Sequence, residues 1–209
     1  MNILIKFKNL VIESLKDNKK LIIGLAIIFI VSFIGGWALS GSAMKSVVAN
    51  LSASNATGDM TSLTATELFV DNEFGGIVTY FGSVFFAIFA IVSLVYNGLN
   101  LGMFGQMFDN LIPNGGLKYI VYIIPHGIFE LTATVLQSAA GVLLFLFIWR
   151  FIKACISSEV EGVSNAFEIS KKALIQSIVL MIFSTILLLI AAPIEAYFSV
   201  PFSEFVLGF

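Results

Sequence analysis

The sequence predicts an all-α membrane protein whose chain crosses the bilayer several times. Of its 209 residues, 58% are hydrophobic and only 11% are charged, which is far from the composition of an ordinary soluble domain. The hydrophobic residues are gathered into runs close to the roughly 20 residues that a spanning helix needs. A net charge of -2, with lysines dispersed along the chain, leaves no basic surface for nucleic acid. The partner that composition implies is the lipid bilayer.

Residues 1–20 are predicted to form a cytoplasmic amphipathic tail. Between residues 3 and 15, apolar side chains recur at helical spacing, and the charged side chains fall elsewhere on the helix. Such a helix lies in the plane of the membrane surface. The apolar run that follows is longer than the core of a signal peptide, so it predicts a retained span over residues 21–44.

A single membrane domain with about five crossings is predicted over residues 21–198. The segment 98–127 is apolar, but prolines and glycines interrupt it, so it is predicted as a broken or re-entrant crossing. Non-helical backbone at membrane depth is tolerated only where protein or a water-filled cavity satisfies its polar groups. In chain order the predicted segments are the span 21–44, the exterior loop 45–73, the span 75–97, the broken crossing 98–124, the span 126–152, the cytoplasmic loop 153–172, the span 173–198 and the exterior tail 199–209.

The basic residues predict the orientation of the chain in a cell membrane. Five of the eleven lysines and arginines lie in the N-terminal tail and four lie in residues 150–172. Cytoplasmic segments are enriched in these residues, so the tail and the late loop are both predicted to be cytoplasmic. With five crossings, the C-terminus is then outside.

The helix that begins near Pro125 carries a continuous polar face among leucine, isoleucine and phenylalanine. Ionisable groups turned toward lipid cost at least about 2.5 kcal/mol each, so this face should meet other helices or water. Gly127 permits close backbone approach, and a neutral His126 is expected to donate a hydrogen bond to Glu130. The polar face consists of His126, Glu130, Thr134, Gln137, Ser138 and Gly141.

The last span carries a second polar face. It consists of Ser177, Ser184 and Glu195, and Pro193 is expected to kink the helix beside Glu195. The derived topology places Glu195, Glu130 and His126 at similar depth near the outer side. The cluster could be a hydrogen-bonded structural lock, or it could handle protons or ions. A metal at these three residues is a weaker alternative, because an HExxH motif and a second histidine are absent.

Catalysis is not predicted, and no cofactor is expected. A G-x-S-x-G motif is absent, and Asp109 is the only aspartate at membrane depth, so serine and aspartyl hydrolase sites lack parts. The stretch NGLNLGMFG instead predicts close helix packing through Gly98, Gly102 and Gly105, with Asn97 hydrogen-bonding across helices. The same glycine-rich faces make a homodimer one expected partnership.

Three ordered stretches resemble a known family. They are NGLNLG at residues 97–102, PHGIFEL at 125–131 and AAPIEAYF at 191–198. Together they resemble the stage II sporulation protein M family over about residues 20–198, with Pro-His-Gly-x-x-Glu as the most specific motif. The family pattern predicts a proline at residue 132, where this sequence has Thr132. The resemblance implies a multi-pass membrane protein without established enzymatic activity, and its namesake anchors peptidoglycan-remodelling partners during engulfment in spore-forming bacteria.

Two functions from different classes follow. The first is a non-catalytic membrane scaffold or anchor that recruits membrane or envelope protein partners. The second is a transporter or channel that uses His126, Glu130 and Glu195 for ion or proton handling. A cavity at Glu130 would favour the second function, whereas a dry and fully hydrogen-bonded site would favour the first.

Overall fold

The computed structural model describes residues 3–41, 45, 63–158, 160 and 162–208, and every regular element in these ranges is an α-helix. The helices are α1 (Ile3–Asp17), α2 (Lys19–Leu39), α4 (Ala65–Gly82), α5 (Ile88–Leu111), α6 (Gly115–Ile156), α7 (Gly162–Tyr197) and α8 (Ser199–Leu207). Of these, α2, α5, α6 and α7 are long and apolar enough to cross a membrane. The prediction of an all-α polytopic membrane protein is therefore confirmed.

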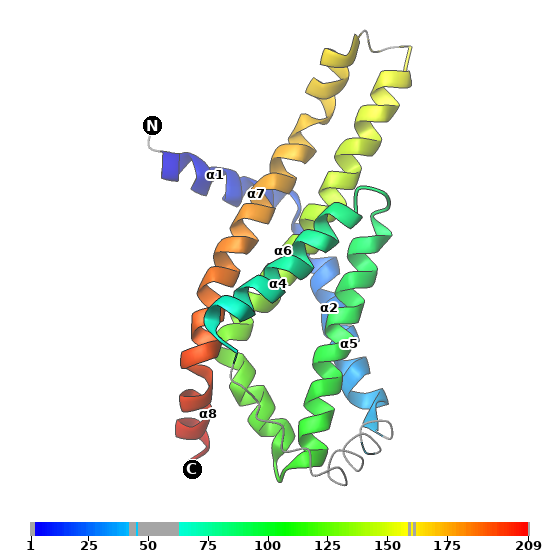
Figure 1. Ribbon diagram of the computed structural model, residues 1–209. Coiled ribbons are helices and arrows are strands. Elements are labelled where there is room, and N and C mark those ends of the chain that lie inside the picture. Colours follow the sequence, from blue (N-terminus) through cyan, green and yellow to red (C-terminus); the bar gives the residue numbers. More distant parts are fainter. Residues whose placement is uncertain (1–2, 42–44, 46–62, 159, 161, 209) are drawn as a thin grey trace.

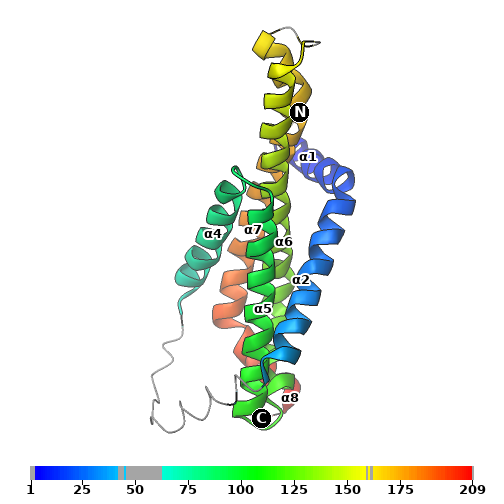
Figure 2. The ribbon, with the colours of Figure 1, turned by 90° about the vertical axis from the view of Figure 1, so that its right-hand side faces the viewer.

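Helices α6 and α7 form a long antiparallel hairpin against which the other helices pack (Figure 1). Helices α2 and α5 lie side by side next to α6, and α4 crosses the hairpin obliquely, in contact with both α6 and α7 (Figure 2). Helix α1 turns away from the axis of α2 near one end of the bundle, and α8 lies at the other end.

The positions of α1 and α7 agree with the charge distribution of the sequence. Lys172 Nζ is 2.7 Å from Asp17 Oδ2 and 3.5 Å from Glu13 Oε1. Gln176 Nε2 also donates to Asp17 Oδ2 at 2.9 Å. The N-terminal tail and the end of the basic segment 150–172, which lies on α7, are therefore at the same end of the molecule. That this end faces the cytoplasm stays a prediction.

The predicted span 75–97 is not one helix. Helix α4 ends at Gly82, the chain turns, and α5 begins at Ile88. Ser83 is fully buried at this turn, and its hydroxyl donates to the carbonyl of Thr79 at 2.6 Å, a bond that competes with regular helix hydrogen bonding. Because the turn is itself apolar, hydropathy could not separate the two helices.

Helix α4 occupies part of the predicted exterior loop 45–73, of which residues 46–62 lie outside the described residues. Its start is fixed by a capping box, in which Thr64 Oγ1 accepts from the backbone of Glu67 and the Glu67 side chain accepts from the backbone of Thr64. This arrangement satisfies two helix-terminal donors at once. Helix α4 runs antiparallel to α5 and is not among the four long apolar helices.

The predicted broken crossing 98–124 is also corrected. Residues 98–111 complete α5, and α6 begins at Gly115 and continues past Pro125 without interruption. The reversal is confined to the residues between them, where Asn114 has a left-handed φ of 57° and Asp109 Oδ1 accepts from the backbone of Gly116 at 3.2 Å. Pro125 removes one backbone donor, a loss that a long packed helix tolerates. Between α2 and α5, the described part of the chain that runs back toward the α1 end is α4 (Figure 1).

The two last predicted spans lie inside longer helices. The span 126–152 is part of α6, which reaches Ile156, and the span 173–198 is largely part of α7, which begins at Gly162. The predicted cytoplasmic loop 153–172 is therefore mostly helical, and the α6–α7 hairpin projects beyond the other helices (Figure 1). The predicted tail 199–209 contains α8.

Helices α2 and α5 approach each other closely at the glycines for which packing was predicted. A Cβ atom on Gly102 would lie 2.7 Å from the backbone nitrogen of Trp37, and one on Gly98 would lie 2.8 Å from the carbonyl oxygen of Phe29. Gly105 lies against the Trp37 ring. Because these faces are used within one chain, they are not free to form a homodimer, and a dimer stays an untested prediction.

Candidate functional site

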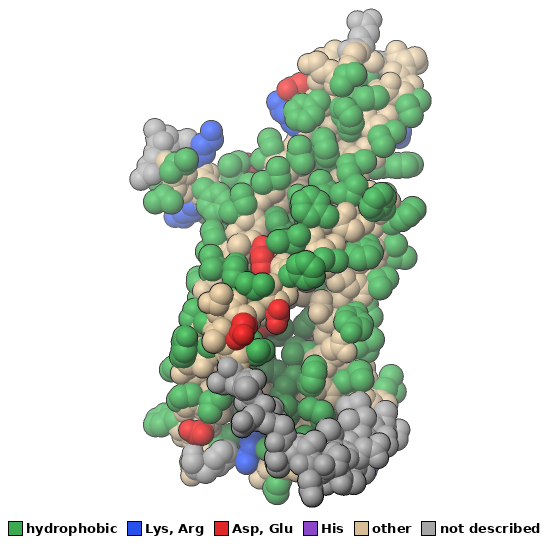
Figure 3. Space-filling view, viewed as in Figure 1, with side chains coloured by type: hydrophobic (Ala, Val, Ile, Leu, Met, Phe, Trp, Pro, Cys, Tyr) green, Lys and Arg blue, Asp and Glu red, His purple; other side chains and the backbone are tan. Residues whose placement is uncertain are grey.

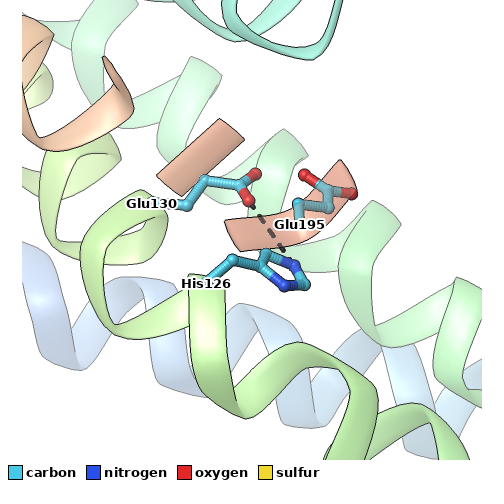
Figure 4. A group of neighbouring side chains, drawn as sticks. All are labelled: His126, Glu130 and Glu195. Atoms are coloured by element: carbon cyan, nitrogen blue, oxygen red, sulfur yellow. Dashed lines mark ion pairs between the residues drawn. The ribbon is translucent and has the colours of Figure 1, made fainter. Parts of the chain in front are cut away.

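The structure brings together the three ionisable residues that the topology placed at similar depth. His126 and Glu130 lie one turn apart on α6, and Glu195 faces them from α7 (Figure 4). One potential ligand atom from each residue lies within 4.8 Å of the other two. His126 is only 4% exposed, and the Glu130 side chain is 22% exposed. These residues are named the imidazole–carboxylate cluster here.

The antiparallel packing of α6 and α7 produces this juxtaposition. Pro193 lies inside α7, which continues to Tyr197, so Glu195 remains on a helix. Ala191 and Ala192 are almost completely buried beside it, and such small side chains allow a close approach of helices. The cluster thus sits on two rigid helices rather than on a loop.

The hydrogen bond expected from His126 to Glu130 is not present. His126 Nε2 is 3.8 Å from Glu130 Oε2, which is too long for a hydrogen bond. Instead, His126 Nδ1 lies 2.8 Å from Ser199 Oγ, and the Ser199 hydroxyl donates to the carbonyl of Ile194 at 3.2 Å. With its single proton donated to Ile194, the Ser199 hydroxyl accepts from Nδ1–H, and we assign this neutral tautomer to His126. The Nε2 lone pair then faces the carboxylates.

Sequence reasoning missed two residues that contact this cluster. Ser199 was assigned to the exterior tail, yet it lies four residues after Glu195, and helical spacing extended beyond α7 would have placed it on the same face. Tyr122 lies one turn before His126. Its hydroxyl donates to Glu195 Oε1 at 3.5 Å, and its ring is edge-on to the imidazole at a centroid distance of 5.3 Å.

A polar chamber adjoins the cluster. It is a cavity of about 240 Å³ between α2, α4, α5 and α6, and Glu130 forms part of its wall. Asn72 of α4 also lines the chamber and lies close to the Glu130 carboxylate. The chamber is lined by Phe29, Asp71, Asn72, Gly75, Gly76, Thr79, Asn97, Asn100, Leu101, Phe104, Glu130, Leu131, Thr134, Gln137 and Ser138.

Most residues of the predicted polar face of α6 line the chamber. Thr134, Gln137 and Ser138 line it. Gly141 instead provides close packing, because a Cβ atom there would lie 2.7 Å from Ser83 Oγ. Asn97 lines the chamber, and within the described part of the chain its side chain does not form the hydrogen bond expected across helices.

The polar face predicted on α7 does not extend into the chamber. Ser184 is fully buried, and its hydroxyl donates to the Met181 carbonyl of its own helix at 2.7 Å. Ser177 Oγ donates to the Ala140 carbonyl at 2.7 Å, which ties α7 to α6. Of the predicted face, only Glu195 joins the cluster.

Acidic residues of α4 form the part of the site that the sequence prediction assigned to a loop. Glu73 accepts hydrogen bonds from Thr185 Oγ1 at 2.7 Å and from Gln137 Nε2 at 3.3 Å, so it joins α4 to α7 and α6. In the space-filling view, acidic side chains gather over α4 beside a hollow in an otherwise mostly hydrophobic face (Figure 3). The capping box at Thr64 was the sequence signal that a helix begins before these acids.

An apolar groove lies between α2 and α6. Its volume is about 650 Å³, and it shares Phe29, Leu101 and Leu131 with the polar chamber, so these three side chains separate the two spaces. Gly127 lines the groove, as does Thr132, whose hydroxyl donates to the Ile128 carbonyl of its own helix at 2.6 Å. The departure from proline at residue 132 therefore falls on the groove and not in the chamber.

Comparison with known proteins agrees with the three sequence motifs. The family model described as Stage II sporulation protein M matches residues 25–200, which include most of α2, the chamber and the imidazole–carboxylate cluster. No curated protein and no solved structure gives a significant match. The match covers well over half of the chain. The protein is therefore a member of the stage II sporulation protein M family of membrane proteins.

Proposed function

We infer that this protein is a non-catalytic membrane protein that admits a proton or a cation to Glu130 through the polar chamber. The observation that carries the proposal is the cavity of about 240 Å³ that contains the Glu130 carboxylate inside the helical bundle. A chamber lined by carboxylates and amides at membrane depth is costly to maintain. A purely structural lock would not need such a chamber, whereas ion or proton handling requires one.

The position of the chamber suggests access from one side. Toward the α1 end, buried apolar residues close the bundle, and its largest fully buried side chains are Leu94, Leu136 and Leu180. The basic residues of α1 and α7 support a cytoplasmic position for that end. In this orientation the imidazole–carboxylate cluster and the end of α7 lie on the exterior side, so the chamber would load from outside. Passage to the cytoplasm would require the core helices to move.

Reconstitution tests this proposal. Purified protein in liposomes that contain a pH-sensitive dye should show proton or cation-coupled flux, and Glu130→Gln should abolish that flux while the amount of folded protein is retained. Glu204→Gln is the matched control, because Glu204 is exposed on α8 and should not alter flux. Equal leak from wild type, Glu130→Gln and empty liposomes would reject ion handling.

A scaffold remains the second candidate, and the projecting α6–α7 hairpin favours it. Ile156, Val163 and Ile169 on this hairpin are 79%, 67% and 61% exposed. Exposed apolar side chains beyond the other helices are suited to contact with a partner protein. A scaffold predicts that Glu130→Gln chiefly lowers folded abundance, and that a photo-crosslinker at Val163 gives a defined product in cells.

A further inference from the structure

The imidazole–carboxylate cluster has the ligand set of a metal site. His126 Nε2, a Glu130 oxygen and a Glu195 oxygen lie within 4.8 Å of one another and come from two antiparallel helices. Ligand atoms about 2.1 Å from a tetrahedral metal lie roughly 3.4 Å apart. Small side-chain rotations would therefore bring all three atoms to a single ion. We propose that the cluster binds one divalent transition-metal cation, such as Zn²⁺ or Mn²⁺.

The orientation of the imidazole supports this proposal independently of the carboxylates. The ring is buried, and its Nδ1–H is held by Ser199, so Nε2 carries the lone pair that a metal requires. Among the described residues, none hydrogen-bonds to Nε2. Metal-binding histidines almost always donate their other ring N–H to a fixed acceptor, as His126 does to Ser199.

The charge of the cluster also calls for a cation. Glu130 and Glu195 lie close together at membrane depth, and no described lysine or arginine forms an ion pair with either carboxylate. Two neighbouring carboxylates without a cation repel each other when both are ionised. A divalent ion would neutralise both. The Tyr122 hydroxyl donates to Glu195, a supporting contact of the kind that holds metal-binding carboxylates in place.

The ligand types select the class of ion, and the chamber supplies an entry path. Calcium and magnesium prefer oxygen ligands, whereas imidazole favours zinc and other transition metals. Glu130 belongs both to the cluster and to the chamber wall. An ion that reaches the chamber would therefore meet its first ligand there. This inference deepens the proposed function, since it names the class of cation that Glu130 receives.

Metal content of the full-length protein in detergent tests the proposal. After EDTA treatment and dialysis against Zn²⁺, the wild type should retain one ion per chain, and Co²⁺ should give the visible absorption of a nitrogen- and oxygen-bound ion. His126→Gln and Glu195→Gln should each lower the affinity at least tenfold. Glu204→Gln should bind as the wild type does.

The outcomes separate this inference from the proposed function. If a variant does not fold, Mn²⁺ electron paramagnetic resonance on the wild type, competed by Zn²⁺, reports the same site without mutation. Wild type that binds no more metal than the double variant His126→Gln/Glu195→Gln, or no metal at all, would overturn the metal site, even if Glu130-dependent proton flux is present. Stoichiometric binding without any flux would instead support the metal site and reject transport.

Discussion

His126 Nδ1 on α6 lies 2.8 Å from Ser199 Oγ at the start of α8, so a hydroxyl beyond the last spanning helix fixes the imidazole of another helix. Both side chains are buried. The same hydroxyl is held in turn by the Ile194 carbonyl. Helix α8 is thus part of the site and not a trailing segment.

Ser199→Ala should destabilise the protein by about 1–3 kcal/mol, because it leaves the buried Nδ1–H of His126 without an acceptor. Denaturant unfolding in detergent measures this loss. Ser203→Ala is the control, since the Ser203 hydroxyl donates only to the nearby Val200 carbonyl. Equal stability of the two variants would contradict the role assigned to Ser199.

Gly102→Ala should destabilise the protein by about 1–3 kcal/mol, because its Cβ would collide with the backbone of α2 near Trp37. Gly24→Ala is the matched control on α2, where no described atom beyond its own helical turn lies within 4 Å of the added carbon. That change should be neutral or stabilising, since alanine favours a helix by about 1 kcal/mol over glycine. Thermal unfolding should therefore shift in opposite directions; similar losses for both variants would argue against close α2–α5 packing.

Thr185→Val should cost about 1–2 kcal/mol, because it removes the donor that Thr185 supplies to Glu73 across the α4–α7 interface. Thr132→Val makes the same chemical change on the apolar groove. There the hydroxyl bonds only to its own helix, so the expected change is within about 0.5 kcal/mol. Unfolding of the two variants in parallel distinguishes them, and a neutral Thr185→Val would mean that α4 is not held by this contact.

Docking of α1 should weaken in acid. The hydrogen bond from Lys172, followed by that from Gln176, holds the pKa of the Asp17 carboxyl below its ordinary value of 3.8. The pKa of Asp17 is therefore lower in the folded protein than in the unfolded chain. Its contacts with Lys172 and Gln176 stabilise the packing of α1 on α7 above the unfolded pKa, and this stabilisation is lost as the pH falls through the folded pKa. Asp17→Asn at neutral pH should therefore reproduce the acid state.

Spin labels measure this docking directly. With Cys155→Ser as background, labels at Lys6→Cys and Ser164→Cys report the distance between α1 and the hairpin. Addition of Asp17→Asn should broaden the distance distribution, whereas addition of Glu168→Gln should not, because Glu168 pairs with Lys171 of its own helix. A distribution that is unchanged by Asp17→Asn and by acid would show that other contacts hold α1.

The features that could be predicted from the sequence are those set by the periodicity of a single helix or by the direction in which a helix crosses the membrane. The polar face from Glu130 to Ser138 follows from helical periodicity, and the approach of Glu195 follows from the antiparallel course of two spans. The turn near Ser83 could not be predicted by hydropathy, because an apolar hairpin and an apolar span have the same composition. Prolines misled the prediction because they were expected to interrupt a helix. Pro125 instead lies inside the unbroken helix α6. Ser199 was missed because the prediction ends the membrane domain at residue 198 and places residues 199–209 in an exterior tail.

Access to the polar chamber from the exterior side is the central claim, and cysteine labelling tests it most directly. In a Cys155→Ser background, Asn100→Cys places a thiol in the chamber wall and Ile128→Cys places one on an exposed apolar position of α6. A membrane-impermeant thiol reagent added outside proteoliposomes of defined orientation should label residue 100 much faster than residue 128, and bound Zn²⁺ should slow that labelling. Equal and negligible labelling at both positions would contradict a chamber that is open to the exterior.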